Sequence, residues 1–155
     1  MDDAVFMAEA IAEARRGIER GDGGPFGSVV VHGGEIVGCG HNTVVRSNDP
    51  TAHGEISAIR NACAALATFD LSGCTLYTTG EPCPMCLAAC MWANVERVVY
   101  GCTLEDNAAI GFRDVRFDKT LSIDREALSG YLTRFGRDDC LKVFDEYRLI
   151  GGTRY

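Results

Sequence analysis

The sequence predicts a single α/β domain in which helices cover both faces of one sheet. Segments with helical spacing alternate with short β-branched segments in the order α-β-β-α-β-α-β-α, and this order is typical of a sheet enclosed by helices. The 155 residues are enough for one domain with its own core, and because 46% of them are hydrophobic, disorder is disfavoured. The sequence contains no internal repeats, low-complexity tracts or linker-like stretches.

The chain is expected to begin with a helix and a hairpin. Asp2 or Asp3 caps a helix that runs to about Arg20, where a run of glycines ends it. Apolar residues at helical spacing form its buried face: Met7, Ile11, Ala14 and Ile18. Residues 26–32 and 35–42 are then predicted to pair as a β-hairpin across a two-glycine turn.

Two further helices are predicted to begin at residues that bear chemistry. One starts near His53, after a capping cluster at residues 48–51. Its expected buried stripe consists of Ile56, Ile59, Cys63 and Leu66. Residues 74–79 are β-branched and aromatic, which predicts a buried strand. The other helix covers residues 83–93, with Pro82 suited to its first position.

The pattern weakens toward the C-terminus. Residues 95–101 form an apolar run that predicts a strand in a covered sheet. A short helix is expected over residues 105–110, followed by a loop over 111–118. The final helix is expected over residues 138–148, with an apolar face of Leu141, Phe144 and Tyr147.

The motifs His53-Gly54-Glu55 and Pro82-Cys83-Pro84-Met85-Cys86 predict a metal centre. One imidazole, from His53, and two thiolates, from Cys83 and Cys86, can hold Zn²⁺ in three tetrahedral positions and leave the fourth for water. The metal lowers the pKa of that water toward neutrality. Glu55, two residues past His53, can reach the open position without filling it, so it is the candidate to carry the water's proton to the leaving group.

Less specific interpretations of these motifs stay open. A lone His-x-Glu is common at helix starts, and a Cys-x-x-Cys can be a redox pair or half of a structural zinc site. A structural site needs a fourth ligand, for which Cys74, Cys90 and Cys102 are candidates, and the protein would then be an interaction module. The joint motif favours a catalytic metal, because it supplies three ligands and a carboxylate without a structural role.

Composition narrows the class of partner and the compartment. A net charge of −7 and an isoelectric point near 4.9 argue against a nucleic-acid partner and favour a small neutral substrate. There is no apolar run long enough to cross a membrane, and the N-terminus lacks the pattern of a signal peptide. The eight cysteines are therefore expected to be reduced and mostly buried, including Cys39, Cys63 and Cys74, and the expected location is the cytoplasm.

The chain resembles the cytidine deaminase-like superfamily and, within it, the guanine deaminases. The matching segments are residues 23–27, Asn42, residues 48–53, 81–86 and 111–114, and the terminal Tyr155. The resemblance implies a three-layer α/β/α sandwich around a five-stranded mixed sheet, with one deaminase domain over residues 1–155. It also implies a homodimer, in which the C-terminal segment can swap onto the partner subunit.

The resemblance implies zinc-dependent hydrolysis of a free nucleobase, with guanine converted to xanthine and ammonia. Two departures keep alternatives open. Gly54 replaces the alanine common between the ligand and the catalytic Glu, so that residues 53–57 look more like fungal cytosine deaminase. Gly80 also replaces a larger residue. Cytosine, a related amino-pyrimidine or triazine, and guanosine therefore remain as alternative substrates.

The resemblance also implies roles for residues beyond the metal. Asn42 would hydrogen-bond the base, Phe26 would stack on it, and Asp114 would be a second carboxylate that acts with the catalytic Glu. Tyr155 would lie over the substrate. Other conspicuous side chains are expected to be structural: His41 as a satisfied histidine; Met91, Trp92 and Tyr100 in the core or a dimer contact; and Arg113, Arg116 and Lys119 on a solvated face.

Overall fold

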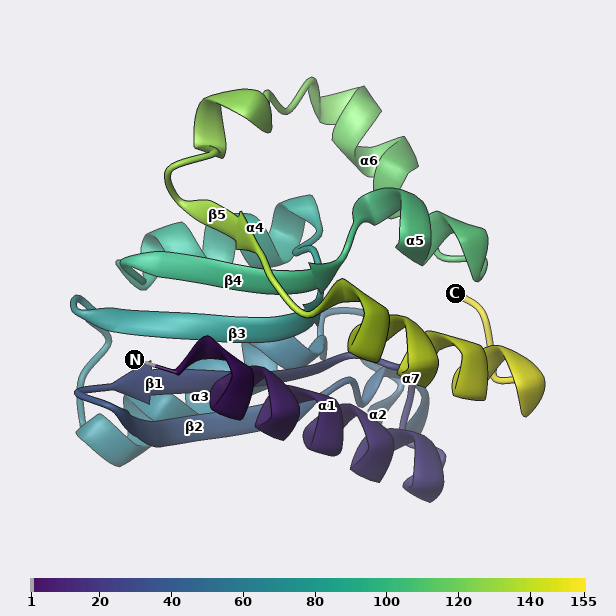
Figure 1. Cartoon of the computed structure of the whole chain (residues 1–155), viewed down its shortest axis with the longest axis horizontal. Coiled ribbons are helices and arrows are strands. Elements are labelled where there is room, and N and C mark those ends of the chain that lie inside the picture. Colours follow the sequence, from purple (N-terminus) through teal and green to yellow (C-terminus); the bar gives the residue numbers. More distant parts are fainter. Residues whose placement is uncertain (1) are drawn as a thin grey trace.

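The computed structural model describes residues 2–155 and has three layers (Figure 1). Helices α1 (Asp3–Arg20) and α7 (Arg137–Leu149) cover one face of the sheet. Helices α3 (Gly54–Leu66) and α4 (Pro84–Trp92) cover the opposite face. The predicted α/β/α sandwich is confirmed.

Within residues 2–155 the sheet has five strands, in the order β2-β1-β3-β4-β5. Their bounds are β1 Gly27–His32, β2 Glu35–His41, β3 Cys74–Gly80, β4 Arg97–Cys102 and β5 Leu132–Arg134. Strand β1 pairs antiparallel with both β2 and β3, whereas β4 pairs parallel with β3 and β5, so the sheet is mixed. Residue patterns alone did not locate β5, because three residues are too few to show alternation.

Two apolar cores lie on the two faces of the sheet. Val29 and Val31 of β1 face the core beneath α1 and α7, which also buries Tyr77 and Phe144. Val30, between the two valines in sequence, faces the core beneath α3 and α4. Successive strand residues point to opposite faces, so continuous apolar strands are needed when both faces are covered.

Helix α3 buries a different stripe from the one predicted. The buried positions are Ala58 and Ala62, together with Gly54 and Glu55 in the first turn, whereas the predicted apolar residues are only partly buried. The reason is close packing on β2: a Cβ at Gly38 would lie 2.6 Å from the Ala58 carbonyl oxygen. Small residues on both elements let the helix lie directly on the strand.

The start of α4 also differs from the prediction. Cys83 is the N-cap and Pro84 takes the first helical turn, so the helix begins two residues later than a start at Pro82 would place it. Proline suits this position because its missing N–H has no helical acceptor. Consequently a predicted metal ligand, Cys83, sits at the cap itself.

The segment after β4 contains two helices rather than one helix and a loop. Helix α5 (Leu104–Ala109) is confirmed, and Thr103 and Asp106 close its capping box. Helix α6 (Asp114–Leu121) contradicts the predicted loop over 111–118. It has no fully buried residue, and its apolar side chains Phe117 and Leu121 are exposed rather than packed in the core. A short α2 (Val44–Ser47) and a 3₁₀ turn (Glu126–Leu128) complete the elements described.

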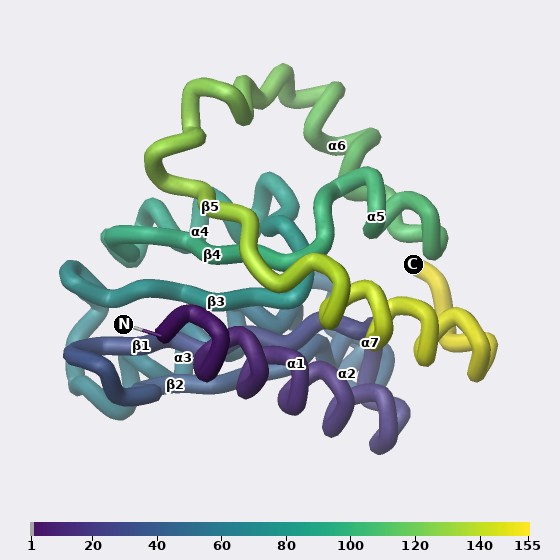
Figure 2. The backbone as a smooth tube through the Cα atoms, viewed as in Figure 1, coloured from purple at the N-terminus to yellow at the C-terminus, as the bar shows by residue number. Residues whose placement is uncertain are grey.

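After α7 the last residues turn back, and the chain ends beside α5 (Figure 2). Arg154 packs against Gly111, two residues after α5 ends, because a Cβ at Gly111 would lie 2.6 Å from Arg154 Cδ. Among residues 2–155, no helix combines the length and hydropathy needed to cross a membrane.

The cysteines are free, and most are buried as expected. Cys39 contradicts this expectation: it is exposed, because it lies on the outward side of edge strand β2. Cys63 is half-buried on α3.

Candidate metal-dependent active site

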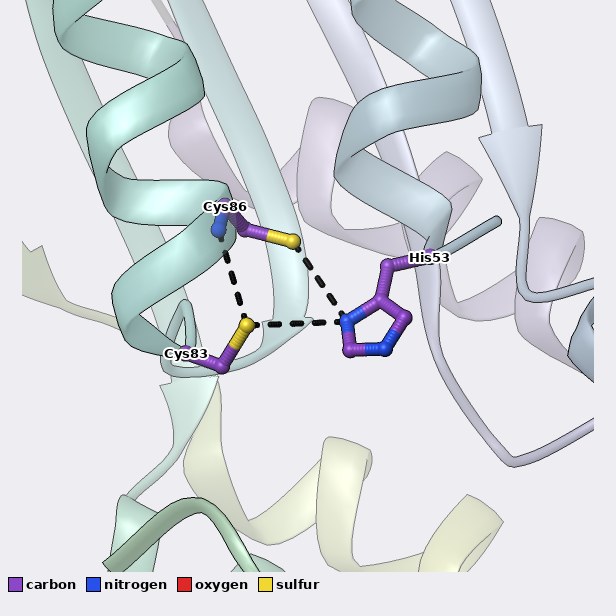
Figure 3. Close-up of side chains that lie close together, drawn as sticks. All are labelled: His53, Cys83 and Cys86. Atoms are coloured by element: carbon purple, nitrogen blue, oxygen red, sulfur yellow. Dashed lines mark hydrogen bonds between the residues drawn. The ribbon is translucent and has the colours of Figure 1, made fainter. Parts of the chain in front are cut away.

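The three predicted metal ligands meet at the N-terminal ends of two helices (Figure 3). His53 is the N-cap of α3, Cys83 is the N-cap of α4, and Cys86 lies in the first turn of α4. The Nδ1 atom of His53 is 3.6 Å from Cys83 Sγ and 3.5 Å from Cys86 Sγ. Residues far apart in the sequence are thus brought within one coordination sphere.

These separations fit a tetrahedral zinc ion. With Zn–N of about 2.05 Å and Zn–S of about 2.3 Å, a tetrahedral angle places nitrogen and sulfur about 3.6 Å apart. One imidazole with two thiolates is also a donor set that suits Zn²⁺. Among the described residues, no fourth Cys or His joins this group, so one position stays available for water or substrate. Zinc is therefore the metal that the site fits.

The environment favours thiolate at Cys83. Hydrogen bonding with the Cys86 side chain lowers the pKa of Cys83 to about 4, with a further contribution from His53, against the opposing effect of burial. The N-terminal end of α4 adds the positive end of the helix dipole. In contrast, burial strongly raises the pKa of Cys90, so this neighbouring cysteine stays a thiol.

Glu55 lies in the first turn of α3 and is buried. Its Oε1 accepts a hydrogen bond from Thr78 Oγ1 at 3.3 Å, and Thr78 Oγ1 itself accepts one from Ser28 Oγ at 3.0 Å. Burial raises the pKa of Glu55, and the nearby charge of Cys83 acts in the same direction. A carboxylate with raised proton affinity, next to the metal ligands but outside their group, is suited to proton transfer.

A cavity of about 460 Å³ opens in front of the ligands. Among the residues that line it are all of the predicted substrate-binding residues and both predicted carboxylates, together with two of the three metal ligands: Phe26, Asn42, His53, Glu55, Cys83, Asp114 and Tyr155. Its volume lies within the range of small-molecule sites, about 300–1,000 Å³.

Asn42 enters the cavity with its amide orientation determined by hydrogen bonds. Its Oδ1 accepts from Val44 N at 3.1 Å and from the Tyr155 hydroxyl at 2.6 Å. Both acceptor positions of the oxygen are therefore in use. The Nδ2 group, which has no acceptor among the described residues, is left to donate to a ligand.

Tyr155 contributes its hydroxyl to this arrangement rather than to the open cavity. The hydroxyl donates to Asn42 and accepts from Gly24 N at 2.9 Å. A glycine is needed there, because a Cβ at Gly24 would lie 2.9 Å from that oxygen. The Tyr155 ring packs edge-on against Phe112, with centroids 5.1 Å apart.

Phe26 combines packing with a place on the cavity wall. Its ring packs edge-on against Phe112 at 4.9 Å and against Phe144 at 5.4 Å between centroids. A ring held in this way presents a fixed surface to the cavity.

Asp114 is the first residue of α6, and its Oδ2 accepts a hydrogen bond from Asn107 Nδ2 at 2.9 Å. Burial raises the pKa of Asp114, while the hydrogen bond from Asn107 opposes this rise. Sequence reasoning missed Asn107, because one amide within a short helix shows no pattern that indicates a role.

Arg125 ties α6 to the segment that carries the metal ligands, and it too was missed. Its guanidinium donates to Asp118 of α6 at 2.7 and 2.9 Å and to Glu81 Oε1 at 3.3 Å. The other oxygen of Glu81 accepts from Leu104 N at 3.0 Å. Because Glu81 immediately precedes the Pro-Cys motif, the ion pairs link the cavity's outer helix to its floor.

His41 is the satisfied structural histidine that the sequence predicts. Its Nδ1 and Nε2 lie 2.7 Å from carboxylate oxygens of Glu13 and Asp22, respectively. Hydrogen bonding with Glu13, aided by Asp22, raises the pKa of His41 against the effect of burial. These two contacts hold β2 against α1 and the glycine-rich turn that follows α1.

Two of the three side chains expected in the core or a dimer contact lie outside the core of this chain: Trp92 is 87% exposed and Met91 44% exposed. Tyr100 is half-buried and packs against the core beneath α3 and α4. The basic residues Arg113, Arg116 and Lys119 are exposed as predicted, although Arg113 also lines the cavity edge and stacks over Phe117.

Known proteins resemble this chain in both sequence and structure. The family model for the cytidine and deoxycytidylate deaminase zinc-binding region matches residues 1–102. Guanine deaminase of Bacillus subtilis is 47% identical over 114 residues, which are 74% of this chain and 73% of that protein. The tRNA-specific adenosine deaminase of Aquifex aeolicus is 43% identical over 100 residues, 64% of this chain and 66% of that protein.

Solved structures extend the similarity over the whole fold. The structure of B. subtilis guanine deaminase covers 100% of this chain and 99% of its own, with a TM-score of 0.76 and 38% identity. That of guanine deaminase from Nitrosomonas europaea covers 96% of this chain and 85% of its own, with a TM-score of 0.79 and 30% identity.

Proposed function

The chain belongs to the cytidine and deoxycytidylate deaminase family, and on that premise we propose that it deaminates guanine by zinc-dependent hydrolysis, giving xanthine and ammonia. One observation carries the proposal: Glu55 and the metal ligands His53 and Cys83 line the same cavity as Asn42 and Asp114. A purine needs such a polar wall in addition to the catalytic floor, because its two fused rings carry several donors and acceptors.

We assign His53, Cys83 and Cys86 as the zinc ligands, on the ground of their mutual distances. Zinc bound there supplies a Lewis acid that makes a water molecule acidic enough to react near neutral pH. Glu55 takes one proton from the attacking water and delivers it to a ring nitrogen, and then takes the remaining hydroxyl proton of the tetrahedral adduct and delivers it to the amine, which leaves as ammonia. Its raised pKa lets it hold each proton during its transfer.

Three residues orient the base in this proposal. Asn42 donates through Nδ2 to an acceptor on the base, since its oxygen is already engaged. Asp114 faces a donor edge and assists Glu55 in proton transfer, and its raised pKa supports that role. Phe26 stacks on the base.

A free base suits the site better than a nucleic acid. The net charge is −7, and phosphate backbones require a basic surface. Tyr155 and α6 also form part of the cavity wall, which leaves less room for a polymer. We further propose that the protein works in the cytoplasm, where its free cysteines would stay reduced.

We also propose a homodimer. Trp92 and Met91 present a large apolar surface at the end of α4, and such side chains are enriched at protein interfaces. Exchange of the C-terminal segment between subunits stays a prediction. In a single chain Tyr155 already reaches Asn42 of its own cavity.

The test is an ammonia-release assay on guanine, guanosine, adenine, cytosine and a simple aminotriazine, with purified zinc-loaded protein. We expect the highest kcat/KM for guanine, and background rates for every base with Glu55→Gln. Efficient release from cytosine or the triazine without activity on guanine would contradict the substrate assignment. Release that persists in Glu55→Gln would contradict the mechanism.

A further inference from the structure

We propose that Asn107 is a positioning residue that orients the Asp114 carboxylate through its Nδ2 and offers its own Oδ1 to an N–H group of the bound base. The inference rests on the proposed function of the same cavity and names a residue that would help to select its substrate.

Hydrogen bonds allow only one orientation of the Asn107 amide. Its Nδ2 donates to Asp114 Oδ2 at 2.9 Å and reaches the Glu81 carbonyl oxygen at 3.5 Å. Both partners are acceptors, so the amide nitrogen must face them and the amide oxygen must face the other way.

The helix that carries Asn107 is held in place by several hydrogen bonds. Asn107 is only 1% exposed, on a helix whose start is closed by the Thr103–Asp106 capping box. Arg137 adds two hydrogen bonds to Asp106, at 2.7 and 2.8 Å. A buried amide on such a fixed helix can hold a partner in one direction.

The oxygen of this amide has no donor. Asn107 Oδ1 is buried and finds no hydrogen-bond partner among the residues that the structure describes. Buried acceptors are almost always paired, so an unpaired one on a side chain that helps to line the cavity points to a group that the cavity receives.

Gly80 and Phe26 lie beside this oxygen, and Phe26 lines the cavity. A Cβ at Gly80 would lie 3.1 Å from Asn107 Oδ1 and 3.1 Å from Phe26 Cδ1. The glycine therefore leaves room for the oxygen and the ring to approach the same point. A base stacked on Phe26 would bring its edge within reach of Oδ1.

Together, the two side chains form an acceptor pair. Only Oδ2 of Asp114 is engaged by a neighbouring side chain, which leaves the other carboxylate oxygen for a ligand. Two acceptors side by side favour a base edge with N–H groups, such as the protonated lactam edge of guanine, over the unprotonated ring edge of adenine.

Three variants test the proposal: Asn107→Leu, which removes both hydrogen-bonding groups; Asn107→Asp, which keeps an oxygen acceptor and removes the donor; and Asn61→Ala. Asn61 is exposed and donates to the Cys39 carbonyl, so its loss is the control for removing one amide far from the cavity. Zinc content and Tm are measured for each.

The kinetic constants of every variant are measured with the base that the wild type deaminates fastest. A substrate other than guanine would therefore overturn the proposed function while leaving this test intact. We expect Asn107→Leu to lower kcat/KM by about ten- to a hundred-fold. Asn107→Asp should lower kcat while leaving KM within about threefold, because its oxygen still binds the base. Asn61→Ala should match the wild type.

A double-mutant cycle separates positioning from a merely structural role. If Asn107 acts through Asp114, then Asn107→Leu should lower kcat much less in an Asp114→Asn background than in the wild type. Additive effects, or wild-type kcat/KM in Asn107→Leu, would overturn the proposal. Should the leucine variant lose zinc or fold, the near-isosteric Asn107→Asp takes its place in the cycle, with the same criteria.

Discussion

Replacing Tyr155 by phenylalanine removes a single oxygen from the cavity wall and tests how the amide of Asn42 is oriented. The hydroxyl accepts from Gly24 N and donates to Asn42 Oδ1, at 2.9 and 2.6 Å. The ring and its contact with Phe112 would remain. The variant therefore isolates the hydrogen bonds from the packing.

The expected magnitude follows from the groups left without partners. Gly24 N loses its acceptor and Asn42 Oδ1 loses one of two donors, whereas Val44 N still holds the oxygen. A buried polar group left unpaired costs about 1–3 kcal/mol. Tyr155 lies at the chain end and is only half-buried, so water can enter and the lower part of that range applies. A loss of about 1–2 kcal/mol corresponds to about a five- to thirty-fold decrease in kcat/KM for guanine.

The assay is steady-state ammonia release with zinc content and Tm measured in parallel. Tyr131→Phe is a matched control, because the Tyr131 hydroxyl is buried and has no partner within the described part of the chain. Its removal should leave kcat/KM unchanged and Tm equal or higher. A kcat/KM for Tyr155→Phe within twofold of the wild type would refute the view that this hydroxyl orients Asn42.

Four further predictions follow from the site. Cys83→Ser should sharply lower the zinc measured per chain by metal analysis, and unchanged zinc content would remove this cysteine from the ligand set. Glu55→Gln should retain zinc and Tm but lose at least about 100-fold in kcat, and near-normal turnover would require another proton carrier. His41 has a raised pKa in the folded state, so its contribution to stability is complete below its unfolded pKa of about 6.5 and is lost as pH rises through the folded value. The Tm difference between wild type and His41→Gln should therefore shrink from pH 6 to pH 9, and a constant difference would contradict a charged imidazole. If the C-terminal segments swap, a 1:1 mixture of Glu55→Gln and Tyr155→Phe that has exchanged subunits at random should recover about a quarter of wild-type activity, because half of its dimers are mixed and each of these has one intact site; unswapped tails would give no recovery beyond the separate variants.

Local geometry explains why the metal ligands could be predicted from the sequence. His53 and Glu55 are two residues apart at a helix start, and Cys83 and Cys86 share one helical turn. Such spacings constrain side-chain directions before any tertiary contact forms. The long apolar strands and the first and last helices were predictable for the same reason, because their periodicity is a local property.

The remaining features depend on contacts between distant segments. The buried stripe of α3 follows from two glycines on β2, and the apolar residues Phe117 and Leu121 of α6 line a cavity rather than a core. Residue patterns do not show which small residue will face which helix.

The side-chain amides of Asn42 and Asn107 are the clearest case of a feature that depends on the tertiary structure. Asn42 meets Tyr155 across 113 positions of the chain, so no local pattern could orient its amide. Asn107 and Asp114 are seven residues apart, but the turn between α5 and α6 decides whether they meet. The sequence by itself therefore determined the metal-binding chemistry and the general order of helices and strands. Only the tertiary structure decided which donors and acceptors face the cavity, because a hydrogen bond requires two groups at about 3 Å and distant segments reach that distance only when the whole chain packs.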